Sequence, residues 1–549
     1  MSLSRRQFLG TAAGAGVAAF LAACQEEAAK PPAERILNVF AGASGQFTEN
    51  FNQFAPTPLN GTRGLVYEPL FFFNQAKADD VQPILATKYE FGDDGKSLTF
   101  TLREGVKWSD GKPFTADDVA FNFLYRKNNP ALNANGTNIV DATVVDAKTV
   151  KIMFKDPVYT ELWNIAGRTY MVPKHVWEPI TDPTKEINAN PVGTGPFIRD
   201  TFAAQSYVLK KNPGYWDSGK PKIAGLRFWS FTGNDAATTA LASGQLDWAG
   251  IFIPDIQTQF IAKDPAHNKF KNESFLYVTN LIPNLTKPPF TDLAVRQAIN
   301  VALDRPKIIK LAFADLGALP SPLQLVVPTF SSYISPKLSG VKAEYKPDEA
   351  KRLLETAGWA KGADGIYAKN GKKLSFTCNL VTGWTDYEAT MQVVQQLLKE
   401  VGIEFKPNAL SYNAFIAAMQ SGDFEMAIYN AWGGPHPYFM YNNICSSKSI
   451  PPANQNNARW KNSAVDTALT TIAATPPDQI DAIKQQIYAI QDAIVAEIPY
   501  IPIQQSSSLA ELRTVNATGW PTEQNPYALA LPFSEPDCGI VAKNLTPVA

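Results

Sequence analysis

The stretch Phe100–Tyr125, FTLREGVKWSDGKPFTADDVAFNFLY, predicts a strand, a tight turn and a helix in that order. Apolar and polar residues alternate over Leu98–Arg103, which is typical of a half-buried strand. The turn follows at Ser109–Pro113, because Asp-Gly and Pro adopt turn dihedrals at little cost. Thr115 followed by Asp118 forms a capping box, which marks the start of a helix. The stretch contains no pattern of a catalytic nucleophile, a metal site or a phosphate-binding loop. By itself it therefore indicates a structural unit.

The same stretch resembles the signature of a known family. Asp93–Phe121 follows, almost residue for residue, the pattern DDGKSLTF-LREGVKWSDGKPFTADDVAF of the family 5 extracellular solute-binding proteins. Members of this family are the large receptors of ABC importers for oligopeptides, dipeptides, nickel and some oligosaccharides. Two further motifs are similar to family patterns: the V-G-T-G-P-F run at Val192–Phe197, and the P-F-x-D-x-x-V-R-Q-A-I-N-x-A-x-D-R run within Pro288–Ile309.

The resemblance implies an α/β fold with two lobes, the clamshell of the large type II (cluster C) periplasmic binding proteins, with an extra domain inserted in the first lobe. A chain of 549 residues is too long for one hydrophobic core, which agrees with several domains. The predicted boundaries are 35–62, 188–288 and 503–549 for lobe I, 63–187 for the inserted domain, and 289–502 for lobe II. The resemblance also implies a monomer that docks on ABC permease subunits.

Local patterns predict the other elements. Ile36–Phe40 is a short apolar strand, and Pro347 begins a helix that Gly358 closes. A second capping box at Thr385–Glu388 predicts a helix that ends at Gly402. Helices that alternate with strands in this half of the chain favour an α/β sheet.

The composition narrows the function classes. The formal net charge is −1, so there is no electrostatic case for a nucleic-acid partner. Apolar residues make up 45% and charged residues 18%, a globular balance. Aromatic residues make up 11%, which suits either an ordinary core or a ring-lined cleft.

The N-terminus predicts export. Ser4–Leu9 matches the twin-arginine motif S-R-R-x-F-L, and the apolar run that follows is too short to be a convincing membrane span. Leu21-Ala22-Ala23-Cys24 resembles a lipobox, so we expect lipidation at Cys24, residues 1–24 as the signal and residues 25–34 as a tether. The protein would then be anchored to the outer face of the cell membrane. A plain signal peptide with an incidental cysteine is the alternative.

No residue pattern favours a metal, a cofactor or catalysis. Cys378, Cys445 and Cys538 show no CxxC spacing, and either one disulfide or three buried thiols would suit an exported protein. The chain has 3 histidines and no cluster of them, so nickel is not favoured. HExxH, GxSxG, P-loop and GxGxxG motifs do not occur, so we expect no enzyme. A glycosidase needs only two carboxylates, and 51 acidic residues do not exclude that alternative.

The loop after the strand Phe424–Asn430 is the strongest candidate for ligand contact. Gly433, Gly434 and Pro435 stop the strand next to Trp432. The alternative is a loop whose rings fill the core. The family places ligand contacts here, and its oligopeptide receptors carry an Asp after the Trp, in W-x-x-D-x-x-[DE]-P, that pairs with the peptide ammonium. This chain has no acid there.

The loop instead resembles the cello-oligosaccharide binders, W-G-x-P-x-P-[WYF]-x-x-Y followed by N-x-x-R-[YW]-x-N, at Trp432–Tyr441 and Asn456–Asn462. Phe51–Phe54 is likewise similar to their F-N-P-F. Sugar rings stack on aromatic side chains, and Asn, Gln and Arg match hydroxyl groups. The candidate ligand-binding residues are Gln46, Phe47, Asn50, Trp229, Asn280, Trp384, Asn430, Trp432, His436, Tyr438, Arg459 and Trp460.

The sequence therefore predicts a receptor that captures a short oligomeric solute, a neutral oligosaccharide, in an interlobe cleft. An oligopeptide receptor is the alternative, because an acid elsewhere, such as Asp235 or Asp386, could reach the ammonium. A chaperone-like receptor for unfolded chains is a further class, and it would bind long denatured peptides while ignoring sugars.

Overall fold

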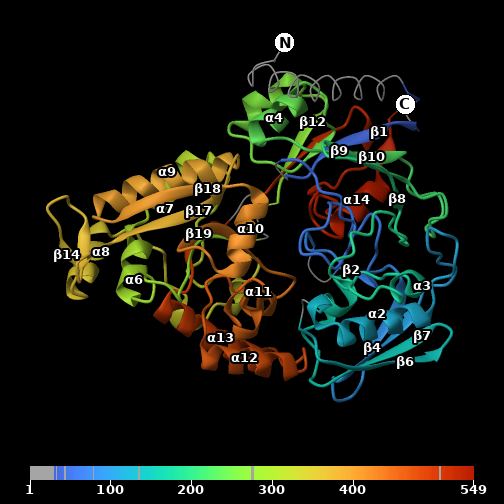
Figure 1. Ribbon diagram of the computed structural model, residues 1–549, viewed down its shortest axis with the longest axis horizontal. Helices are drawn as coiled ribbons and strands as arrows, with labels where there is room; N and C mark the ends of the chain where they lie inside the picture. Colours follow the sequence, from blue (N-terminus) through green and yellow to red (C-terminus); the bar gives the residue numbers. More distant parts are fainter. Residues whose placement is uncertain are drawn as a thin grey trace, which may run out of the picture.

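The computed structural model describes residues 30–548 apart from 32–33, 43–44, 78–79, 134–135, 274–276 and 506–507. The predicted signal, Cys24 and most of the tether lie outside the described residues. Within the described part of the chain, we find no helix of the length and apolarity that crossing a membrane requires. The chain forms two α/β bodies that lie side by side (Figure 1).

The first body is built on a seven-stranded sheet in the order β12-β21-β11-β1-β10-β9-β8. Its central strand β1 (Ile36–Phe40) is the one predicted from the sequence, and it runs parallel to β10 (Gly225–Trp229) and β11 (Trp248–Ala249). The other strands are β8 (Phe197–Ala203), β9 (Ser206–Lys211), β12 (Asn268–Asn272) and β21 (Leu509–Arg513). Helices α4 (Asn234–Ala242), α5 (Ile256–Gln259) and α14 (Asp537–Asn544) belong to this body, as do the short paired strands β22 (Ala517–Thr518) and β23 (Thr546–Pro547).

Attached to it is a four-stranded antiparallel sheet covered by helix α2 (Ala116–Asn128). Its strands, in spatial order, are β4 (Ala86–Phe91), β5 (Ser97–Leu102), β7 (Thr149–Phe154) and β6 (Ile139–Asp146). Shorter elements beside it are β2 (Phe71–Phe73), β3 (Val81–Pro83), a π-helical turn at Trp163–Gly167 and α3 (Lys174–Trp177).

The signature stretch forms the predicted strand, turn and capped helix. The Asp118 carboxylate accepts hydrogen bonds from the Thr115 amide at 2.9 Å and from the Lys174 amide at 3.0 Å, so it caps α2 and also holds α3. One turn later, the Asn122 side chain donates to the Val172 carbonyl and accepts from the Val172 amide. These residues therefore fix the inserted part and do not contact the cleft described below.

The second body is built on a five-stranded sheet in the order β18-β17-β19-β13-β20. Its strands are β18 (Glu404–Leu410), β17 (Ser375–Val381), β19 (Met426–Trp432), β13 (Tyr277–Pro283) and β20 (Ile501–Gln505), and β14 (Ala360–Lys361), β15 (Tyr367–Lys369) and β16 (Lys372–Lys373) form a small sheet. Its helices are α6 (Leu293–Ala302), α7 (Arg305–Phe313), α8 (Pro347–Thr356), α9 (Thr385–Glu400), α10 (Tyr412–Ser421), α11 (Pro437–Cys445), α12 (Ser463–Ala474) and α13 (Ile480–Glu497).

Two details differ from the sequence predictions. Strand β13 lies before the predicted boundary at 288/289 and β20 crosses the one at 502/503, yet β13 pairs with both β19 and β20, so both strands belong to the second sheet. The N-cap of helix α9 is Trp384 and not Thr385, with which the predicted capping box began. The Glu388 carboxylate accepts a hydrogen bond from the Gly383 amide, which precedes this N-cap. Apart from the places of β13 and β20, the predicted division into lobes and an inserted domain stays a prediction.

The glycines of the V-G-T-G-P-F run allow two chain segments to touch. A Cβ atom at Gly193 would lie 2.0 Å from the Val66 carbonyl oxygen, and one at Gly195 would lie 2.2 Å from the Leu65 carbonyl oxygen. The Gly195 amide donates to the Val66 carbonyl at 2.9 Å. Larger residues would therefore force the crossing segment away from Leu65 and Val66.

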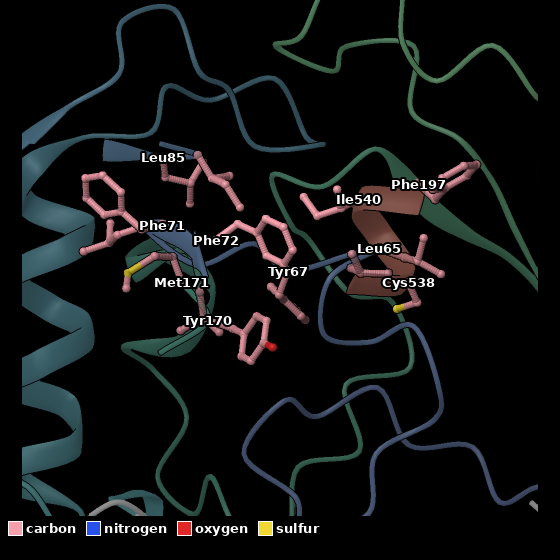
Figure 2. Close-up of a cluster of buried hydrophobic side chains, with 14 of the residues drawn as sticks. Leu65, Tyr67, Phe71, Phe72, Leu85, Tyr170, Met171, Phe197, Cys538 and Ile540 are labelled. Carbon is pink, nitrogen blue, oxygen red and sulfur yellow. The ribbon is translucent and has the colours of Figure 1, made fainter. Parts of the chain in front are cut away.

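The crossing segment borders a core that joins the first sheet to the inserted part. Figure 2 shows Leu65, Tyr67 and Phe72 beside Cys538 and Ile540 of α14. Cys378, Cys445 and Cys538 are all buried free thiols. Of the two states that the sequence left open for these cysteines, the structure therefore contains the buried thiols.

Candidate ligand-binding cleft

A cavity of about 850 Å³ is lined by residues of both bodies. Its aromatic lining is Phe47, Trp163, Phe252, Tyr277, Trp384, Tyr387, Tyr412, Tyr429, Trp432 and Phe533. The ring of Trp432, the last residue of β19, lies 4.4 Å from that of Tyr277, the first residue of β13, because the two residues are paired across the sheet. The tyrosine hydroxyl is hydrogen-bonded to Ser508, which also lines the cavity.

Neutral amide side chains form the second part of the lining. They are Gln46, Asn50, Asn60, Gln75, Asn234, Asn413, Gln420, Asn430, Gln455 and Gln504. The side-chain oxygen of Asn430 accepts a 2.9 Å bond from the Thr279 hydroxyl. The side-chain N–H₂ of Asn430 is left as a donor. Amides of this kind can both donate to and accept from a polar ligand.

Charged groups are few in the described lining, and they are Arg63, Arg168, Asp386 and Glu535. Arg63 and Glu535 pair with each other at 3.3 Å, and Arg63 also donates to the carbonyls of Gln53 and Ala55. Arg168 is exposed and lies 5.0 Å from the centre of the Trp163 ring. Arg63, Glu535 and Arg168 therefore already contact other protein groups.

Asp386 is the acidic group of this described lining that has no partner of opposite charge, whereas Glu535 pairs with Arg63. It lies in the first turn of α9, is half-buried, and has no ion-pair partner among the described residues. Burial raises the pKa of its carboxyl to about 6, backbone hydrogen bonds oppose this, and the nearby Glu388 adds to it. The cleft thus contains a carboxyl group whose charge no described cation balances.

Six of the predicted site residues line this cavity: Gln46, Phe47, Asn50, Trp384, Asn430 and Trp432. The first three come from the irregular segment after β1, Trp384 is the N-cap of α9, and Asn430 and Trp432 lie at the end of β19. Trp432 is half-buried, with part of its ring accessible from the cleft.

The other six predicted residues do not line the cavity, and each has a structural partner. The indole N–H of Trp229 donates to Asn38, that of Trp460 donates to Glu497, and the Asn280 side chain exchanges hydrogen bonds with Gln324. Arg459 donates to the carbonyls of Met419 and Gln420 at the end of α10.

The remaining two, His436 and Tyr438, belong to the start of α11. His436 is the N-cap of this helix, and its Nδ1 accepts a 3.1 Å bond from the Tyr438 amide. The expected loop at Ala431–Tyr441 is therefore partly helical, because Pro437 occupies a position at which helices readily begin.

Sequence reasoning missed several residues of the lining, among them Trp163, Arg168, Tyr277 and Gln455. Gln455 directly precedes the quoted N-x-x-R-[YW]-x-N motif, so that motif could have indicated it. Its side-chain Oε1 accepts a bond from the Trp432 amide at 3.4 Å. Trp163 lies in the inserted part and reaches the cleft through tertiary structure that no local pattern reveals.

The two bodies touch at both sides of the cleft. The Tyr438 hydroxyl of α11 donates to the Glu161 carboxylate at 2.9 Å, and the ring of Phe439 lies 4.7 Å from that of Trp163. Elsewhere, the Asn234 amide at the start of α4 donates to the Gly383 carbonyl at 3.2 Å. These contacts enclose the cavity between the bodies.

Comparison with known proteins agrees with this architecture. The chain is 29% identical over 495 residues to the glutathione-binding protein GsiB of Salmonella typhi, covering 86% of this chain and 90% of the relative. Its structure is similar to that of a mannohexaose-bound periplasmic oligopeptide-binding protein of Thermotoga maritima, with a TM-score of 0.85, 26% identity, and coverage of 94% and 99% of the two chains.

A third comparison shows the same fold. The oligopeptide-binding protein AppA of Bacillus subtilis, solved with a nonapeptide, has a TM-score of 0.80 and 22% identity, over 94% of this chain and 99% of that chain. The family model for the bacterial extracellular solute-binding proteins, family 5 Middle, matches residues 80–451. With two α/β bodies around a ring-lined cavity and a family match over most of its length, the chain belongs to the family 5 extracellular solute-binding proteins.

Proposed function

We propose that the protein is the substrate-binding component of an ABC importer, and that its cleft captures a short neutral oligosaccharide for delivery to the permease. The observation that carries this proposal is the composition of the lining, in which aromatic rings and neutral amides from both bodies face one cavity. It acts as a receptor and not as an enzyme, as the names of its relatives also suggest.

The physical match is between ring faces and sugar faces. The C–H faces of a pyranose stack on Trp384 and Trp432, while amides such as Asn430 bond the hydroxyl groups at the rim. The mannohexaose found in the Thermotoga maritima relative supports a sugar as the ligand class.

An oligopeptide is the second candidate, and Asp386 is the observation that favours it. A carboxylate without a described cationic partner can pair with a peptide α-ammonium, the role that the loop after Trp432 does not fill. The names of GsiB and AppA also favour a peptide.

The delivery cycle that we propose follows from the contacts between the bodies. The ligand stabilises the closed state through its better contacts there, and the closed form docks on the permease. Lipidation at Cys24 keeps the receptor at the outer face of the membrane. A Cys24→Ser protein that stays in the membrane fraction at unchanged mass would contradict the anchor.

Calorimetry tests the ligand class directly. Cellobiose to cellopentaose and a mixture of tri- to pentapeptides are titrated separately into the protein, each at low and high salt. A sugar complex held by stacking and neutral hydrogen bonds should show saturable heat that is nearly indifferent to ionic strength. Micromolar binding of peptides with no heat from any oligosaccharide would reject the sugar proposal and leave the peptide receptor. Mass spectrometry of solute that co-purifies with the protein identifies the ligand independently.

A further inference from the structure

A second cavity, of about 590 Å³, lies away from the cleft, where the inserted part meets the C-terminal segment. We call it the Trp216 pocket. It is lined by Gln82, Pro83, Arg103, Trp216, Asp217, Lys220, Gly519, Asn525, Tyr527, Ile540, Lys543 and Asn544. None of these residues lines the ligand-binding cleft, so this pocket is a separate feature of the molecule.

Trp216 is approached by two cations. The Arg103 guanidinium carbon lies 4.4 Å from the centre of the indole ring, and the Lys543 ammonium lies 5.5 Å from it. Arg103 is held in place because it donates to the carbonyls of Ile84 and Pro83 at 2.5 and 3.1 Å. The indole N–H donates to the buried Glu68 at 2.9 Å, which fixes the orientation of the ring.

Lys543 is also held in a defined place, because its helix is fixed in the core. Cys538 and Ile540 of α14 pack beside Leu65 and Tyr67 in the buried cluster of Figure 2. A Cβ atom at Gly539 would lie 2.0 Å from the Gly64 carbonyl oxygen, so the helix and the segment touch closely. One turn further on, Lys543 reaches the pocket.

The charges of the pocket do not balance. Three cations, Arg103, Lys220 and Lys543, line it, against one carboxylate, Asp217, which lies 3.5 Å from Lys220. Glu68, which accepts the bond from the indole N–H, is a further acid beside the pocket; burial raises the pKa of its carboxyl, and the charge of Lys543 acts against this. Lys543 has no carboxylate within ion-pairing distance among the described residues. Burial lowers the pKa of its ammonium, Glu68 and Asp217 act against this, and the neighbouring Lys220 and Arg103 lower the pKa further.

We propose that the Trp216 pocket is a binding site for a phosphate-type oxyanion, held by Lys543, Lys220 and the outer edge of the Arg103 guanidinium above the indole. Guanidinium and ammonium groups are the side chains that bind phosphate oxygens best, through charge-assisted hydrogen bonds. The three cations of the pocket outnumber the acids beside them, Asp217 and Glu68, and an oxyanion in the pocket offsets this excess of positive charge. The phosphate is either free in solution or part of an anionic lipid headgroup.

The test uses the full-length chain carrying Cys24→Ser, so that lipidation does not itself bring the protein to vesicles. Inorganic phosphate is titrated against this parent at constant ionic strength, with chloride as the balancing anion, and binding is followed by calorimetry and by the melting temperature. Saturable binding that stabilises the fold is expected. In Lys543→Met the affinity should fall about tenfold or more, as loss of a charge-assisted bond implies. The matched control is Lys372→Met, an exposed lysine in β16 of the second body, which should bind phosphate as the parent does.

A second arm separates the two sources of phosphate. Flotation with phosphatidylglycerol-containing vesicles, compared with pure phosphatidylcholine vesicles, shows a headgroup site if flotation requires Lys543. Lys220→Met is an independent variant on the loop before β10. If Lys543→Met does not fold, phosphate affinity and flotation of Lys220→Met test the proposal instead. The proposal is overturned if the parent shows neither saturable phosphate binding nor Lys543-dependent flotation. It is equally overturned if phosphate binds the parent and both pocket variants with the same affinity.

Discussion

Tyr438 of α11 donates a 2.9 Å hydrogen bond to Glu161, and in doing so it joins the second body to the inserted part across the side of the cleft. Glu161 is also bonded by the Asn164 side chain at 2.8 Å, and burial raises the pKa of its carboxyl. Neither Tyr438 nor Glu161 lines the cavity. Neither residue therefore contacts the ligand. Their hydrogen bond can influence ligand affinity by stabilising the closed arrangement of the two bodies.

Tyr438→Phe should weaken ligand binding by about 1 kcal/mol, or roughly fivefold, because it removes one hydrogen bond that the closed state makes. Glu161→Gln is the matched control, since the amide oxygen can still accept from Tyr438. Calorimetry gives the affinity, and small-angle scattering gives the ligand-dependent change in radius. An unchanged affinity in Tyr438→Phe would show that this bond has no part in closure.

The same pair predicts a pH dependence of binding. Burial raises the pKa of Glu161, although the hydrogen bonds from Asn164 and Tyr438 act against this. We expect contact with α11 to supply part of that burial, so closure should favour the protonated carboxyl. The resulting contribution to affinity is fully present below the ordinary carboxyl pKa and is lost as the pH rises through the raised value. Affinity measured from pH 4 to pH 8 should show this decline in the parent, and Glu161→Gln should lack it.

His436 predicts a pH dependence of stability with the opposite sign. Burial lowers the pKa of His436 to about 4. In the neutral ring, Nδ1 accepts the bond from the Tyr438 amide and so caps α11. The contribution of neutral His436 to stability is fully present at a pH above the pKa of the unfolded chain, about 6.5. It is lost as the pH falls towards 4. The loss should reach about 2–3 kcal/mol. Because other groups also titrate, the measurement is the difference in unfolding free energy between the parent and His436→Asn, a variant that keeps a capping side chain and does not titrate.

Local patterns predicted the elements that short-range physics decides. The capping box of α2 needs only Thr115 and Asp118, which are three residues apart, and the structure contains it. The strand Ile36–Phe40 is also as predicted, because a short apolar run beside turn residues has few alternatives. Trp432 was predicted at the cleft from the glycines that follow it, and it lines the cavity.

Tertiary contacts decided what local patterns could not. Arg459 has a positive φ of 58°, and this conformation turns its side chain back to the carbonyls of α10 and away from the cleft. Tyr438 was expected in an open loop, but the helix that Pro437 begins directs it to Glu161, 277 residues earlier in the chain. Trp163 and Tyr277 reach the cleft only because the inserted part and β13 fold against it.

Trp432 and Trp460 form a matched pair of ring deletions. Trp432→Ala should weaken ligand binding by about 1–3 kcal/mol with little loss of stability, since the half-buried ring faces the cavity. Trp460→Ala should instead destabilise the fold by about 3–5 kcal/mol, because its ring is buried and its N–H bonds Glu497. Thermal unfolding and calorimetry on both variants distinguish the roles. If Trp432→Ala lowers the melting temperature sharply while the folded protein keeps its affinity, the ring belongs to the core.

Asp386→Asn distinguishes the two ligand classes within one protein. The substitution removes the carboxyl charge at the start of α9 while keeping the size of the side chain and a hydrogen-bonding oxygen. A neutral oligosaccharide needs no charge there, so its affinity should change by less than about threefold. A peptide whose ammonium pairs with Asp386 should lose about 1.5–3 kcal/mol, the contribution of a hydrogen bond to a charged group.

The pH dependence of the parent sharpens this comparison, because burial raises the pKa of Asp386 to about 6. An ammonium ligand binds the ionised carboxylate, so its affinity should fall as the pH drops from 7 to 5, and Asp386→Asn should abolish that fall. For a sugar, the affinity of the parent and of Asp386→Asn should differ little at either pH. Titrations of cellotetraose and of a tripeptide at pH 7 and pH 5 provide the measurement. A large loss of cellotetraose affinity in Asp386→Asn would show that the carboxylate itself accepts hydrogen bonds from the sugar hydroxyls. Sugar binding would then depend on the charge of Asp386, contrary to this prediction.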